Sequence, residues 1–209
     1  MNTMKILHLI PDLNLTCGIS KTIYLIAKNS SVEFQHSVLT FGGDAMEKFR
    51  KAGIPVYAMP FSKSLRLLAF PIIVSRVQKY SAERQIDVLH AHHRFTDLIA
   101  ASIKGRHNVK TVTSVQSFVK GKRAWSFKAP KLIACSTGVR KHLIEYFHVP
   151  AERISVINNF VDPGEMYALQ SASALRKQMK IEDGKIFVAY VGRIDFKEKG
   201  VDVLLQAFK

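Results

Sequence analysis

The sequence predicts an α/β fold in which helices cover both faces of a doubly wound parallel sheet. Short apolar runs alternate with helix-length amphipathic segments along all 209 residues, a pattern typical of βαβ units. The hydrophobic content of 47% is enough to form a sizeable core. The longest purely apolar run covers only residues 186–191, far short of the roughly 20 residues that a membrane-spanning helix needs.

The first part of the chain contains all the strands expected for one complete sheet. Strands are predicted at residues 5–10, 36–41, 56–59, 87–91, 110–115, 131–135 and 153–157. Helical apolar spacing lies between them at residues 20–28, 44–52, 65–80, 96–104 and 137–147. Pro71 interrupts the third helix and predicts a kink or a split there.

The pattern changes after residue 163. A polar helical stretch at 166–180 precedes an apolar strand at 186–191 and a helix that begins at Val201 and is still in progress at Lys209. We therefore expect a first domain at 1–163, a linker or helix at 164–182, and the first βα unit of a second Rossmann-like domain at 183–209. One βα unit cannot close a core, so the second domain is expected to be truncated.

Cysteine usage and the N-terminus predict a cytoplasmic protein. Cys17 and Cys135 are far apart in the sequence, which argues against a disulfide scaffold or a structural zinc site. The N-terminal apolar run is broken by polar residues and resembles a first strand more than a signal peptide.

The chain is strongly basic, and its excess of positive charge is concentrated in one segment. The 31 Lys and Arg residues outnumber 16 Asp and Glu, giving a net charge of +15. Residues 98–144 contain ten Lys or Arg and no acidic residue. Such a segment attracts anionic partners such as lipid head groups, nucleic acid or phosphorylated substrates.

A loop at residues 118–128 mixes cations with aromatic residues. This composition suits an anionic membrane surface, with Lys120, Lys122, Arg123, Trp125 and Lys128 as the contacting residues. A solvated basic face is the alternative. Nucleic acid could also stack on the rings, but no RNA-binding motif accompanies them, so we expect no nucleic-acid partner.

Candidate ligand-binding residues follow the first and fourth strands, where open α/β sheets bind ligands. Gly18 begins the first helix, and backbone N–H groups there suit a phosphate, although an ordinary turn would look the same. His92, His93 or Arg94 could bind an acceptor substrate, with packed structural histidines as the alternative. A metal is not expected, because a zinc site needs further ligands and outer hydrogen-bond partners.

Several blocks together resemble one enzyme family. VGRIDFKEKGVDVLLQAF near the C-terminus is similar to the opening of the donor domain in family-four glycosyltransferases of the GT-B fold. MKILHLIPDL followed by a glycine, DVLHAHH, KLIACS and ISVINNFVD fall in the order and spacing of the corresponding blocks of that family. The resemblance covers essentially the whole chain.

The resemblance implies transfer of a sugar from a nucleotide-sugar to an acceptor, with retention of configuration and without a metal or other cofactor. The N-terminal Rossmann-like domain would hold the acceptor and the C-terminal domain the donor. Arg193 and Lys199 match the basic pair that grips the donor diphosphate, where Gly18 would assist, although solvated loop charges are the alternative. Fixed cations there would stabilise the charge that grows on the leaving group.

Gln116 departs from the pattern of the family. Many relatives carry a histidine at this position that contacts the reacting sugar, and an amide cannot carry a proton. Either the catalytic role has moved to His92 and His93, or this branch works without it.

Two functions follow as expectations. The first is a glycosyltransferase acting on a lipid-linked or polysaccharide acceptor at the inner membrane face, in cell-envelope glycan synthesis, with this chain inactive alone. The second is a non-catalytic, membrane-bound acceptor-binding subunit whose donor domain is a separate chain. A chain that ends within a helix favours the first.

Overall fold

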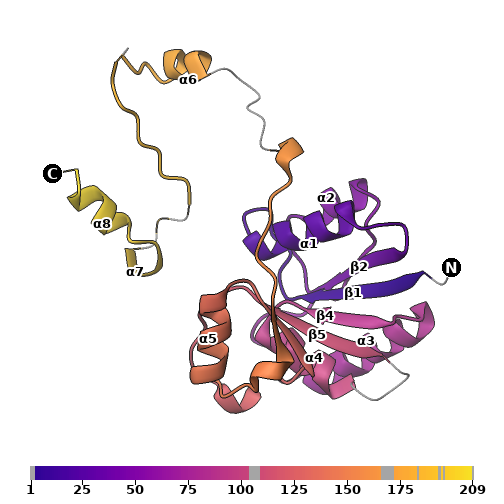
Figure 1. The fold of residues 1–209 in the computed structure, drawn as a ribbon. Helices are drawn as coiled ribbons and strands as arrows, with labels where there is room; N and C mark the ends of the chain where they lie inside the picture. The colour runs from indigo at the N-terminus through magenta and orange to yellow at the C-terminus, as the bar shows by residue number, and fades with distance from the viewer. Residues whose placement is uncertain are drawn as a thin grey trace. The chain divides into compact units, whose positions relative to one another are not determined.

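The computed structural model describes residues 3–103, 109–165, 172–182, 184–192, 194 and 196–208 (Figure 1). The chain divides into two compact units, Met1–Asp162 and Pro163–Lys209. Each unit is described by itself below.

The first unit is built on a seven-stranded sheet in which all neighbouring strands are parallel. The order is β3-β2-β1-β4-β5-β6-β7, so that β1 lies inside the sheet between β2 and β4. The strands are β1 (Met4–Ile10), β2 (Phe34–Thr40), β3 (Val56–Ala58), β4 (Val88–Ala91), β5 (Lys110–Val115), β6 (Lys131–Ala134) and β7 (Ile154–Val156). The predicted α/β fold with a doubly wound parallel sheet is confirmed.

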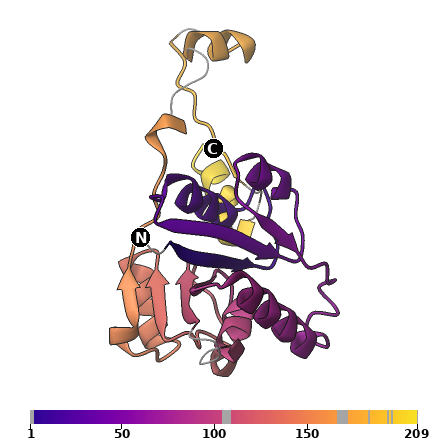
Figure 2. The same cartoon turned by 90° about the vertical axis from the view of Figure 1, so that its right-hand side faces the viewer.

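Helices cover both faces of this sheet (Figures 1 and 2). They are α1 (Gly18–Asn29), α2 (Met46–Lys51), α3 (Phe70–Arg84), α4 (Arg94–Ile103) and α5 (Thr137–Glu145), with short 3-10 turns η1 (Arg123–Trp125) and η2 (Ala151–Arg153). Pro71 lies in the first turn of α3, where its missing N–H costs nothing. The helix predicted at 65–80 is therefore shifted along the chain: turns replace its first residues, and α3 continues to Arg84.

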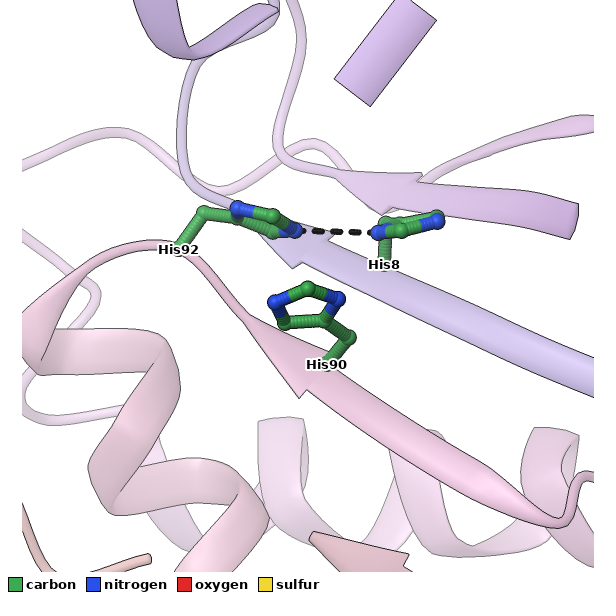
Figure 3. A group of neighbouring side chains, drawn as sticks. All are labelled: His8, His90 and His92. Carbon is green, nitrogen blue, oxygen red and sulfur yellow. Dashed lines mark hydrogen bonds between the residues drawn. The ribbon is translucent and has the colours of Figure 1, made fainter. Parts of the chain in front are cut away.

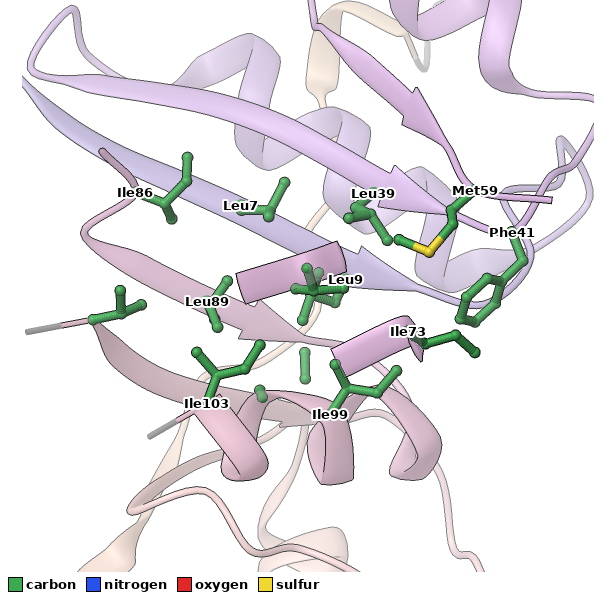
Figure 4. Close-up of a cluster of buried hydrophobic side chains, with 14 residues drawn as sticks. Leu7, Leu9, Leu39, Phe41, Met59, Ile73, Ile86, Leu89, Ile99 and Ile103 are labelled. Carbon is green, nitrogen blue, oxygen red and sulfur yellow. The ribbon is translucent and has the colours of Figure 1, made fainter. Parts of the chain in front are cut away.

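Alternation along β1 directs its side chains to two different cores. Leu7 and Leu9 are fully buried in the cluster beneath α3 and α4, which also contains Leu89 and Ile99 (Figure 4). Ile10 belongs to the opposite cluster with Ile23, Val38 and Phe49, residues of α1, β2 and α2. His8 shares the face of Ile10, so a histidine is buried where parallel sheets normally place an aliphatic residue.

A third cluster lies over β5, β6 and β7. Val115, Leu132 and Ala134 pack there with Val139 and Leu143 of α5. The register pairs Leu9 with Ala91, Ala91 with Thr113 and Thr113 with Leu132, so α5 covers the same face as α3 and α4. The opposite face of β4 to β6 presents His90, Ser114 and Ile133.

The second unit contains η3 (Pro163–Glu165), α6 (Ala172–Gln178), α7 (Phe196–Lys199) and α8 (Val201–Gln206). The strand predicted at 186–191 is not formed. A strand needs a hydrogen-bonded neighbour, and no described residue pairs with this segment. Within the described residues, none of the helices has the length and apolar character to cross a membrane.

Candidate functional site

A cavity of about 540 Å³ lies at the carboxyl ends of β1 and β4. This is the edge of an open α/β sheet where ligands bind. The residues that give it its chemistry are Asp12, Lys63, Arg66, His92, His93 and Lys122, and apolar side chains such as Ile19 and Phe95 complete the wall. Its charged groups are three cations and one carboxylate, which suits an anionic ligand.

Asp12 and Arg66 form the fixed part of this cavity. Arg66 Nη2 donates to Asp12 Oδ1 over 2.8 Å, and the guanidinium lies 4.6 Å from the ring centre of Phe41. The hydrogen bond from Arg66 lowers the pKa of Asp12, although partial burial acts in the opposite direction. Asp12 is therefore ionised near neutrality and holds Arg66 in one position. Lys63, whose side chain is 81% exposed, lies at the rim with its Nζ 3.9 Å from the same carboxylate.

Lys122 reaches the cavity from the basic loop 118–128. Its backbone has a positive φ of 52°, and its carbonyl accepts hydrogen bonds from Trp125 N and Ser126 Oγ. The turn thus fixes the position from which the Lys122 side chain lines the cavity.

Arg94 holds the basic loop in place. Its Nη1 donates to the carbonyls of Lys120 and Gly121 at 3.0 and 2.9 Å, and Tyr146 Oη accepts from Gly121 N. Arg94 does not line the cavity. Its predicted role in binding an acceptor remains a prediction, whereas its contacts indicate a positioning role.

Asp97 anchors the other end of the loop. This carboxylate, fully buried in the first turn of α4, accepts hydrogen bonds from Thr113 Oγ1, Lys128 N and Ala129 N at 2.6, 2.7 and 3.1 Å. Three elements, namely α4, β5 and the segment before β6, are therefore joined through one side chain.

The two predicted catalytic histidines have different environments. His93 is exposed, and its Nδ1 accepts from Phe95 N, so the neutral ring carries its proton on Nε2. His92 is only 3% exposed, and its Nε2 lies 2.9 Å from His8 Nδ1. Burial and then the neighbouring His90 and His8 lower the pKa of His92 well below its ordinary value. His92 is thus neutral at pH 7.

Gln116 lies elsewhere. It lines a smaller cavity of about 220 Å³ with His90, Ser114, Asn158 and Phe160, flanked by α1. The structure therefore brings His92, His93 and Lys122 to one cavity and places Gln116 in another. Another cavity of about 520 Å³, near Lys5 and Arg84, is remote from the carboxyl ends of the strands.

The predicted diphosphate-binding residues are distributed over both units. Gly18 is the first residue of α1, and Cys17 gives that helix no side-chain cap. A Cβ on Gly18 would meet no atom within 4 Å, so a side chain at this position would enter open space. Lys199 ends α7 and is exposed. Arg193 lies outside the described residues.

The predicted membrane-contacting residues lie on the surface. Lys120, Lys122, Arg123, Trp125 and Lys128 are exposed, with Trp125 at 67% and the nearby Phe118 at 64%. Arg123 stacks 4.4 Å from the centre of the Tyr146 ring, which holds its charge close to the loop.

Sequence reasoning missed Asp12, Lys63, Arg66 and Asp97. The position of Asp12, directly after the first strand, was a usable signal, because such residues lie at the ligand-binding edge. Lys63 and Arg66 lie in the segment between β3 and α3. Arg66 falls inside the helix predicted at 65–80, but turns form there instead, and both side chains line the cavity.

The chain is similar to one family model, one curated protein and two solved structures. The model of Glycosyltransferase Family 4 matches residues 17–165. An uncharacterized glycosyltransferase of Methanocaldococcus jannaschii is 21% identical, covering 81% of this chain and 49% of that protein. The crystal structure of Anabaena HepE in complex with UDP-glucose has a TM-score of 0.77 at 21% identity, covering 97% of this chain and 57% of that one. A glycosyltransferase from Rickettsia africae has a TM-score of 0.69 at 16% identity, covering 88% and 51%.

The chain thus spans about half the length of the relatives it matches. At 16 and 21% identity, the structural similarities show a shared fold. The matched residues include most of the strands of the sheet and the helices beside the cavity of Asp12, Lys63, Arg66 and Lys122, which we call the basic cavity. On this evidence, the chain belongs to Glycosyltransferase Family 4.

Proposed function

We propose that this chain is the acceptor-side part of an enzyme that transfers a sugar from a nucleotide-sugar to a lipid-linked or polysaccharide acceptor. The observation that carries the proposal is the cavity of Asp12, Lys63, Arg66, His93 and Lys122 at the carboxyl ends of β1 and β4. Anabaena HepE, which has this fold, binds UDP-glucose, and this supports a nucleotide-sugar as donor here.

The residues suggest a division of roles. Asp12 and the Nε2–H of His93 would bind acceptor hydroxyl groups, since a carboxylate accepts and this tautomer donates. Lys63, Arg66 and Lys122 would hold negative charge on a phosphate-containing ligand. In the whole enzyme, Arg193 and Lys199 would stabilise the departing diphosphate in place of a metal. The proposal that configuration is retained rests on the family resemblance.

Gln116 lies apart from this cavity, and we propose that it contacts substrate without transferring a proton. His92 is buried and neutral, so its part in the reaction is to shape the wall next to His93. His93 is then the histidine that touches the acceptor.

The exposed basic loop suggests where the acceptor is found. Cations at Lys120, Lys122 and Arg123 beside the exposed rings of Phe118 and Trp125 suit the anionic inner face of a membrane. A lipid-linked acceptor in cell-envelope glycan synthesis would be presented there. The enzyme would act in the cytoplasm as a peripheral membrane protein.

The test uses the protein encoded by the full reading frame, supplied with labelled nucleotide-sugars and membrane extract. We expect transfer of label, and we expect none from the 209-residue chain alone. Arg66→Gln and Lys122→Gln should lower kcat/KM by about tenfold or more, since each loses a charged hydrogen bond of about 1.5–3 kcal/mol. Lys79→Gln, which changes an exposed lysine of α3, is the matched control. Normal transfer by both cavity variants would refute the assignment of this cavity.

The exposed loop also favours a second function, a non-catalytic subunit that binds the acceptor at the membrane and needs a separate donor-domain chain. This function predicts that the chain binds anionic vesicles and that activity appears only when the second chain is added. Transfer by the single longer polypeptide would exclude it.

A further inference from the structure

Three buried histidines meet where β1 and β4 lie side by side, and one of them, His92, also lines the basic cavity (Figure 3). His8 of β1 and His90 of β4 are register partners, and His92 follows β4 directly. One ring nitrogen of each lies within 4.8 Å of those of the other two, and the three residues are between 0 and 9% exposed. Such a group of imidazoles is costly to bury unless every nitrogen has a partner.

The outer nitrogen of His8 is fixed by a chain of hydrogen bonds. Ser30 Oγ donates to Ile26 O over 2.7 Å and therefore accepts from His36 Nε2 over 2.8 Å. A neutral His36 then has its lone pair on Nδ1, which accepts from His8 Nε2 over 2.9 Å. His8 Nδ1, the nitrogen that faces His92, consequently carries a lone pair.

His90 has a comparable outer partner. Its Nε2 lies 2.7 Å from the hydroxyl Oγ of Ser114, which lies on the neighbouring strand β5. Donation from Nε2 to this hydroxyl leaves the lone pair on His90 Nδ1. Metal-binding histidines almost always donate their outer N–H in this way, which orients the ring.

His92 completes the group and has an unsatisfied nitrogen. Its Nε2 shares a proton with His8 Nδ1 over 2.9 Å, while its buried Nδ1 has no hydrogen-bond partner among the described residues. If the proton on Nε2 moves to Nδ1, Nε2 gains a lone pair directed at His8 Nδ1, and the ring of His90 lies beside it with its centre 4.1 Å from that of His92. Burial lowers the pKa of all three histidines, so the neutral rings that a metal requires are already present.

We propose that His8, His90 and His92 form a Zn²⁺ site that joins β1 to β4. Three neutral imidazoles suit zinc, whereas Mg²⁺ and Ca²⁺ require oxygen ligands. His90 also borders the 220 Å³ cavity, from which a water supplies the fourth ligand. No redox change is involved, and the proton shared by His8 and His92 moves to His92 Nδ1 without leaving the group.

The ion would stabilise the sheet, and no step of the proposed sugar transfer uses it. His92 is the residue that this site shares with the basic cavity, so the tests below read zinc binding and stability and do not depend on sugar transfer. The group contains no carboxylate to offset the charge of the ion, which limits its affinity. Zinc binding should therefore be reversible and removable by a chelator.

The test uses the untagged 209-residue chain, stripped of metal with a chelator and titrated with Zn²⁺. We expect one equivalent to bind, a rise in unfolding temperature, and a tetrahedral absorption spectrum when Co²⁺ replaces Zn²⁺. Mg²⁺ should give none of these. His90→Gln should abolish the stoichiometric site, while His148→Asn, at an exposed histidine with a positive φ that asparagine tolerates, should retain it.

Ser114→Ala provides a milder test, because it removes only the outer partner of His90 and should weaken binding by about 10- to 100-fold. Circular dichroism identifies variants that fail to fold. If His90→Gln does not fold, the stoichiometry of the wild-type chain and the Ser114→Ala shift still decide. Failure of the wild-type chain to bind zinc, or equal binding by wild type and Ser114→Ala, would overturn the proposal.

Discussion

Asp97 allows the sharpest prediction about stability. Replacing it with Ala leaves the hydroxyl of Thr113 and the backbone N–H groups of Lys128 and Ala129 without their acceptor. An unsatisfied buried donor costs about 1–3 kcal/mol. Because water entering the vacated space can satisfy part of this demand, we expect a total loss of roughly 3–6 kcal/mol in the free energy of unfolding.

Asp97→Asn should also be destabilising, for a different reason. An amide offers only one acceptor oxygen, so its NH2 group would face the N–H of Lys128 where Asp97 Oδ2 now accepts over 2.7 Å. Two donors would then point at each other. Although Asn has nearly the same shape as Asp, we therefore expect Asp97→Asn to lose much of the free energy of unfolding that Asp97→Ala loses.

The assay is urea unfolding followed by circular dichroism, together with hydrogen exchange at Lys128 and Ala129. Asp87→Ala is the matched control, because Asp87 is exposed and accepts a single backbone bond from Lys5 N. We expect it to cost about 1 kcal/mol or less. If Asp97→Ala loses no more stability than Asp87→Ala, and both amides remain protected, the carboxylate is not the anchor of the basic loop.

Three further predictions concern charge. In the metal-free chain, the free energy of unfolding should fall as pH drops from about 6.5 toward 4, because His90 is protonated at its ordinary pKa of 6.5 in the unfolded chain, whereas burial lowers its pKa to about 4 in the folded chain. Each such histidine lowers this free energy by about 1.4 kcal/mol per pH unit in that range. Unfolding curves of His90→Gln should therefore depend less on pH. In the longer protein, Arg193→Ala and Lys199→Ala should each lose about 2–4 kcal/mol of transition-state stabilisation, mainly in kcat, and near-normal rates would show that these are solvated charges. Changing Lys120, Lys122, Arg123 and Lys128 to Ser should remove about 4 kcal/mol of binding to anionic vesicles in low-salt co-sedimentation, and a preference of the wild-type chain for RNA would contradict the membrane proposal.

The strands of the first unit were predictable because parallel strands buried on both faces form short apolar runs. The boundary of α3 was only partly predictable, since Pro71 permits either a kinked helix or a new start. The segment 186–191 has the composition of a strand, but composition cannot supply the neighbouring strand that hydrogen bonding requires.

The groups that carry the site were harder to predict. His8 and His90 are 82 residues apart in the chain, and only the pairing of β1 with β4 makes them neighbours. Asp97 occupies a helical position that its sequence context does not distinguish from an exposed one, and its three partners come from β5 and the segment before β6. Contacts of this kind depend on strand order, which local patterns do not determine.

The inner position of β1 has a consequence for how the chain folds. β1 can pair with β2 as soon as both have left the ribosome, but its second edge remains bare until β4 has been synthesised and has crossed to it. Pairings between segments so distant in sequence are slow to form, and a bare apolar strand edge is a template for intermolecular pairing. The nascent protein should therefore be most vulnerable to aggregation during the synthesis of residues 41–87, and a chaperone that shields β1 in that interval would raise its yield.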